Sequence, residues 1–237
     1  MQKPSLSAII ILFTIIGYFN SLPQNKMKSE LKEFTKPPIL DSYVFSTTGK
    51  NDYFILEPGY QLILEGHTRK DTTRLVITVL NETKKIGKVG TRIVEENETV
   101  NGRTVEISRN YFAFLLQTNS AYYFGEDVDI YKDEQIVEHS GSWVAEGNNK
   151  PGVVMPGLVL DGSRYYQEVA PNIAMDRSEI ISTTQTLETP AGKFTNVMKT
   201  EETTPLEPKV REYKFYAPGI GLIKDDNLLL VKYGFIK

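Results

Sequence analysis

The chain has 237 residues, a formal net charge of −3 at pH 7, 40% hydrophobic residues and 11% aromatic residues. This length and composition suit one large domain with a substantial core, and the absence of a Lys or Arg run argues against nucleic-acid binding. The chain contains no Cys, which excludes disulfides, thiolate metal ligands, a Cys nucleophile and a lipid-anchoring Cys. We expect no cofactor.

The N-terminus carries a hydrophobic segment at residues 6–19 (LSAIIILFTIIGYF), which has 14 residues without a charge and follows Lys3. A membrane-spanning helix needs about 20 apolar residues, so this segment is closer to the hydrophobic part of a signal peptide. We predict a signal peptide over residues 1–22, or alternatively a retained short anchor, followed by a polar tether over residues 23–50. The protein is then exported: periplasmic, secreted, or attached to the membrane only through an uncleaved N-terminal segment.

Residues 51–237 are predicted to form a single all-β domain, because apolar segments of strand length alternate with turn residues and no amphipathic helix is evident. Short connections between consecutive strands imply antiparallel neighbours. We therefore expect an antiparallel meander that forms a curved sheet, a partly open barrel or a sandwich. The predicted strands cover about a dozen segments, among them 53–56, 60–65, 74–80, 91–100, 103–116, 121–124, 179–188, 193–200, 210–216, 219–224 and 227–235.

Asn101-Gly102 is a strong signal for a two-residue hairpin between segments 91–100 and 103–116. The second of these segments alternates, with Val105 and Ile107 on one face and Glu106 and Ser108 on the other.

The stretch 125–171 holds the only Trp, one of the two His and a group of carboxylates at its start. Alternation places Asp127 and Asp129 on one strand face and Glu126 on the other, with Val128 and Ile130. A solvated strand face is the simplest interpretation of the acids. A calcium site at Asp127, Asp129 and Asp133 is an alternative, because hard cations bind several oxygen ligands, although the EF-hand pattern is not met.

Glu126 shares its face with apolar residues, where an unpaired carboxylate is costly and titrates unusually. Glu168 is a second acid of this kind. Two carboxylates that flank a cleft are the minimum for glycoside hydrolysis, so Glu126 and Glu168 are the candidate catalytic residues. Alternatively, each pairs with Arg164 or Arg177 and has a structural role.

Candidate ligand-binding side chains in the same stretch are Trp143, Tyr166, Arg164 and His139. Trp143 is either a core anchor or a platform for ligand stacking. The segment 147–163 contains two Pro-Gly turns and is predicted to be a long, stiff loop. Loops of this length are uncommon in compact domains and are often functional, although this one could also cover an open barrel end.

Several short motifs together resemble an uncharacterised family of exported bacterial and archaeal β proteins. A wider similarity, through the turn at 189–194 and the segment 216–223, concerns periplasmic and lipoprotein β domains of unknown function. The resemblance implies export and an antiparallel β fold but transfers no catalytic residue, and the missing Cys departs from lipid-anchored members. The motifs are Gly125-Glu126-Asp127, Gly141-Ser142-Trp143, Lys150-Pro151-Gly152, Met155-Pro156, Tyr166-Gln167-Glu168, Thr204-Pro205-Leu206-Glu207-Pro208 and Tyr216-Ala217-Pro218-Gly219-Ile220-Gly221.

Our leading hypothesis from the sequence is a non-enzymatic protein that binds a ligand or a protein partner in the cell envelope. It is motivated by export, an aromatic-rich β body and the Trp-bearing stretch, without a catalytic constellation. The alternatives are a hydrolase that acts on an envelope glycan and a structural or calcium-stabilised envelope protein.

Overall fold

The computed structural model describes residues 33–36, 39 and 41–236, and within them every regular element is a β-strand. The all-β prediction is therefore confirmed. The strands are β1 (Phe45–Ser46), β2 (Tyr60–His67), β3 (Thr72–Ile86), β4 (Val89–Val100), β5 (Arg103–Leu115), β6 (Ser120–Lys132), β7 (Gln135–Glu138), β8 (Trp143–Val144), β9 (Lys150–Met155), β10 (Arg164–Tyr166), β11 (Glu168–Val169), β12 (Arg177–Thr189), β13 (Gly192–Thr204), β14 (Glu207–Ala217), β15 (Gly221–Asp225) and β16 (Leu228–Phe235).

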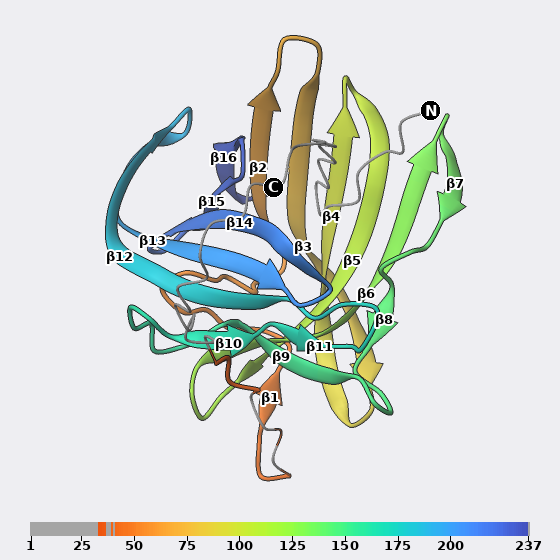
Figure 1. The fold of residues 1–237 in the computed structure, drawn as a ribbon, viewed down its shortest axis with the longest axis vertical. Coiled ribbons are helices and arrows are strands. Elements are labelled where there is room, and N and C mark those ends of the chain that lie inside the picture. The colour runs from red at the N-terminus through yellow and green to blue at the C-terminus, as the bar shows by residue number, and fades with distance from the viewer. Residues whose placement is uncertain (1–32, 37–38, 40, 237) are drawn as a thin grey trace, which may run out of the picture.

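The strands form one antiparallel sheet that curls into a nearly closed barrel. Two meanders build it, one running from β2 to β6 and the other from β12 to β16, and they join where β16 pairs with β2. Figure 1 shows the long strands β2 to β6 side by side, with β12, β13 and β14 crossing the view at a steep angle to them. The twist of a large antiparallel sheet accounts for this curvature.

The predicted hairpin between β4 and β5 is confirmed. Asn101 and Gly102 both have positive φ, 53° and 78°, as a two-residue turn of type I′ requires. This turn, together with a bulge between the pairs Glu98–Glu106 and Thr99–Thr104, sets the register in which Glu98 lies opposite Glu106. The hairpin thereby brings two acidic side chains face to face.

One seam remains where the two ends of the sheet meet. β10 pairs with β12, whereas β11, which follows after Gln167 alone, pairs with β9 at the other end of the sheet. One continuous segment therefore contacts both ends by exchanging its pairing partner at Gln167. Gly152 of β9 allows this close approach, because a Cβ there would lie 2.5 Å from the carbonyl oxygen of Gln167.

Gly152→Ala should destabilise the barrel, because β9 and the backbone at Gln167 would have to separate. We expect the free energy of unfolding to fall by about 2 kcal/mol in urea titrations. Gly90→Ala is the matched control, since a Cβ there meets only the methyl group of Thr47, at 3.4 Å. Equal losses in the two variants would show that the seam does not depend on this contact.

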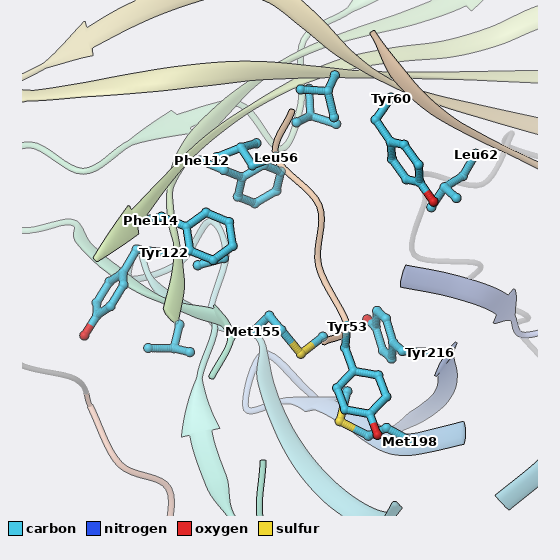
Figure 2. Close-up of a cluster of buried hydrophobic side chains, with 14 of the residues drawn as sticks. Tyr53, Leu56, Tyr60, Leu62, Phe112, Phe114, Tyr122, Met155, Met198 and Tyr216 are labelled. Carbon is cyan, nitrogen blue, oxygen red and sulfur yellow. The ribbon is translucent and has the colours of Figure 1, made fainter. Parts of the chain in front are cut away.

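Apolar side chains fill one end of the barrel. Leu56, in the segment before β2, is fully buried there and packs with residues of both meanders. Figure 2 shows Tyr53 near Met155, Met198 and Tyr216 in the same cluster. The hydroxyl of Tyr53 donates a hydrogen bond of 3.0 Å to the carbonyl of Asn196. The segment before β2 therefore closes the apolar end of the barrel. Other side chains line the rest of the interior.

Part of the expected tether belongs to the domain. β1, within residues 23–50, pairs with β5, and Thr35 forms a parallel bridge with Tyr165 of β10. The predicted signal peptide lies outside the described residues. Within the described part of the chain, none of the secondary structure is a helix of the length and apolarity needed to cross a membrane.

The expected loop over residues 147–163 is corrected by the structure. Its first half is the strand β9, which pairs with β6 on one side and β11 on the other. Pro151 cannot donate a backbone hydrogen bond, and it lies opposite the two-residue strand β11, near the end of the sheet, where a missing donor is tolerated.

Candidate functional site

A cavity of about 650 Å³ occupies the barrel beyond the apolar end. Its walls come from β5, β6, β13 and β14, together with the segments at 139–142 and 172–176. We call this cavity the acidic chamber, because among the described residues six acids and one Lys line it. The acids are Glu106, Glu126, Asp176, Glu202, Glu207 and Glu212, and the Lys is Lys214.

The strand registers place these acids close together. Glu202 lies directly opposite Glu212, as Glu98 lies opposite Glu106. Like charges in such positions are destabilising unless protons or cations compensate them. The interior is thus built with a surplus of negative charge.

A β-bulge directs Glu126 inward. Two residues of β6, Phe124 and Gly125, are accommodated where β5 has one, between the pairs Asn110–Glu126 and Phe112–Tyr123. Gly125 has φ of 136°, and a Cβ on it would lie 2.8 Å from the Cα of Val144, so this position requires glycine. The predicted shared face of Glu126, Val128 and Ile130 is confirmed, because Val128 and Glu126 line the chamber and Ile130 is buried.

Lys214 is the main counter-charge in the chamber. Its Nζ lies 3.0 Å from a carboxylate oxygen of Glu202 and 3.9 Å from one of Asp225. Burial alone would lower the pKa of Lys214, but Asp225 and Glu202 outweigh it and hold that pKa well above the usual value. Lys214 therefore stays charged over the physiological pH range.

Four carboxyls of the interior have pKa values near neutrality. Burial, with repulsion from Glu96 as the next cause, raises the pKa of Glu126 to about 8. Burial also raises the pKa of Glu96, Glu98 and Glu212 to about 7, with neighbouring acids adding to the effect. At neutral pH, the interior thus holds protons on some of its carboxyls and charge on others.

A smaller cavity of about 130 Å³ lies toward the apolar end and shares Lys214 with the chamber wall. Glu96, Asp225 and Gln167 are its other charged or amide-bearing residues. Gln167 is 7% exposed, and its Nε2 donates a hydrogen bond of 3.2 Å to Glu202. Its Oε1 has no hydrogen-bond partner among the residues that the structure describes. Exchanging the amide O and N would set the oxygen against the Glu202 carboxylate, so the orphan atom is the acceptor.

The two acids proposed for hydrolysis both lie inside the barrel but differ in access. Glu126 lines the acidic chamber, whereas Glu168 is 2% exposed and lines neither cavity. The Glu168 carboxylate accepts a hydrogen bond from the backbone N–H of Asp176. Burial and the nearby Asp176 hold the pKa of Glu168 well above its usual value, and Glu126 contributes to this shift. Neither acid pairs with Arg164, which binds Glu179.

Among the four predicted ligand-binding residues, His139 lines the chamber, with Nδ1 at 2.9 Å from Asp129. Trp143 is 4% exposed and packs edge-to-face on Tyr123, with ring centroids 5.3 Å apart. Tyr166 packs edge-to-face on Phe34, and Arg164 binds Glu179 at 3.0 Å. Trp143, Tyr166 and Arg164 line neither cavity.

The acids considered for calcium are separated and mostly engaged with cations. Asp127 binds Lys84 at 3.0 Å, and Asp129 lies 3.4 Å from Arg109 and is also bound by His139. Asp133 lies in the turn that follows β6. No group of three or more Asp, Glu or His side chains among the described residues has a geometry that would hold a metal ion.

Sequence reasoning missed most of the chamber. It singled out Glu126 but not Glu202, Glu212 or Lys214, and it noted Glu106 only as a member of a polar face. The available signal was the alternation of β5, which places Glu106 and Ser108 on one face. These two residues are 6% and 5% exposed, so their face is the inner one. Comparisons with protein-family models, with curated proteins and with solved structures find no match to this chain.

Proposed function

We propose that this chain is an exported, non-enzymatic protein of the cell envelope that binds a small molecule inside its β-barrel. The observation that carries the proposal is the acidic chamber, whose volume of about 650 Å³ lies in the range usual for small-molecule sites. Loops and strand ends, including His139 and Asn172, form part of its wall. The apolar N-terminal segment at residues 6–19 supports export.

Filling the chamber tests this proposal. Val210 lines the cavity from β14, so Val210→Trp should occupy part of its volume and abolish ligand binding. Val137→Trp is the matched control, because Val137 is 57% exposed on β7 and lines neither cavity. Thermal-shift screening against amines, sugars and organic acids should yield a ligand that stabilises the native chain and Val137→Trp but not Val210→Trp. A ligand that stabilises all three proteins equally would contradict a site in the chamber.

A glycan hydrolase is the second candidate, favoured by the pKa of about 8 at Glu126, which keeps this carboxyl protonated at neutral pH as a general acid requires. Its proposed partner, Glu168, does not line the chamber. The chamber therefore supports ligand binding better than the two carboxyls support hydrolysis. Release of reducing sugar from envelope glycans, lost in Glu126→Gln, would favour this alternative.

A further inference from the structure

We propose that the ligand of the acidic chamber is an elongated organic polycation, of the polyamine class, whose ammonium groups bind the interior carboxylates. This inference rests on the proposed function and specifies the chemistry of its ligand.

The first argument is the charge of the interior. Glu96 and Asp225 in the smaller cavity add to the six acids of the chamber, while Lys214 is the one Lys or Arg that lines either cavity in the part of the chain that the structure describes. His139 also lines the chamber, and it already contacts Asp129. A cationic ligand would relieve the repulsion between these acids, whereas an anionic ligand would add to it.

The second argument is the orphan acceptor at Gln167. An amide oxygen that is buried without a donor costs about 1–3 kcal/mol. Gln167, a lining residue of the smaller cavity, has such an oxygen, and its amide nitrogen binds Glu202, a lining residue of the chamber. An ammonium group carries three N–H donors and no acceptor. The missing donor at Gln167 and the carboxylate of Glu202 beside its amide are both complemented by a group of this kind.

The third argument is size and shape. The volume of about 650 Å³ far exceeds that of a single ion, and the acids are distributed along the wall rather than gathered around one point. Apolar side chains, among them Val128, Ile173 and Leu206, line the same cavity. A chain in which ammonium groups are separated by methylene groups presents both charged and apolar surface to such a lining.

Proton release is the signature that distinguishes this mode of binding from general surface attraction. The ammonium groups keep their protons, while the interior carboxyls lose theirs when a cation lowers their pKa. Because the pKa of Glu126 is about 8 and that of Glu212 about 7, binding at pH 7.0 should release protons into the buffer. Calorimetry in two buffers with different ionisation enthalpies measures the number of protons released per ligand bound.

Isothermal titration of the full chain with spermidine, at pH 7.0 and 150 mM NaCl, is the experiment. We expect saturable binding with proton release, and no binding of triethylene glycol, a neutral chain of similar length. The double variant Glu126→Gln/Glu212→Gln should bind at least 10-fold more weakly. Glu82→Gln/Glu134→Gln removes the same charge from exposed positions and should bind as the native chain does.

The interior double variant tests binding rather than folding, because removing two repelling charges should raise its melting temperature at pH 8. Equal affinity in the two double variants, or binding without proton release, would overturn the polyamine assignment. If spermidine fails but a neutral or anionic compound binds in a manner abolished by Val210→Trp, the assignment falls and the proposed function stands. If no compound binds, both fall.

Discussion

Replacing Lys214 with Met is expected to lower the free energy of unfolding by roughly 3 kcal/mol at pH 8 and by much less at pH 5.5. Lys214 lies 3.0 Å from Glu202 and 3.9 Å from Asp225, so its loss leaves both carboxylates without their cation. Acid reduces the effect because it protonates nearby carboxyls such as Glu212, whose pKa is about 7. Urea unfolding at the two pH values measures the difference.

Two further variants separate charge from packing at this position. Lys193→Met removes an exposed Lys from β13 and should change stability by less than about 0.5 kcal/mol at either pH. Lys214→Met/Glu202→Gln should recover part of the lost free energy of unfolding at pH 8, because only one of the two carboxylates that Lys214 contacts then remains. If the free energy of unfolding falls by the same amount at pH 5.5 and pH 8, Lys214 stabilises the fold through the packing of its methylene groups and not through its charge.

The unliganded native chain should itself become more stable as the pH falls from 8 to 5.5. Burial raises the pKa of Glu96 to about 7 and that of Glu126 to about 8, above the value of 4.5 expected for an exposed Glu. The folded chain then binds more protons than the unfolded chain across this window, so the free energy of unfolding falls as the pH rises. One carboxyl shifted to about 7 contributes about 2 kcal/mol between pH 5.5 and 8.

The total change should exceed the contribution of one group, although coupled carboxyls do not contribute independently. Glu96→Gln should be more stable than the native chain at pH 8 and should show a shallower pH dependence. Glu82→Gln, at an exposed position of β3, should follow the native curve. Stability that rises with pH over this range would mean that the interior acids are ionised and compensated in the folded chain.

The fold could be predicted because its signals are local. The Asn101-Gly102 turn and the alternation of β5 depend only on neighbouring residues, and both are present in the structure. β9 was missed because Pro151-Gly152 and Pro156-Gly157 resemble turns. Pro151 and Gly152 are tolerated near the seam, where Gly152 lies against the backbone of the segment that exchanges pairing partners, whereas Pro156 and Gly157 follow the end of β9.

The candidate site was harder to predict because its members come from strands far apart in the sequence. Glu106 and Glu202 meet in one chamber only through the registers of both meanders and the closure of the sheet. The usual assumption that apolar residues face inward also assigns the wrong face to this part of β5. Glu106 and Ser108 are buried, whereas Val105 and Ile107 on the opposite face are only partly so.

The partner exchange at Gln167 also bears on self-association. Unpaired strand edges are templates onto which a second chain can add, and open sheets must protect them. Here the two ends of the sheet are strands of three and two residues, and the shorter follows the longer directly in the chain. Thr35 further occupies β10 through backbone hydrogen bonds to Arg164 and Tyr166. A chain without disulfides therefore offers little edge for intermolecular β-pairing at its seam, and this resistance to aggregation comes from topology rather than from covalent cross-links.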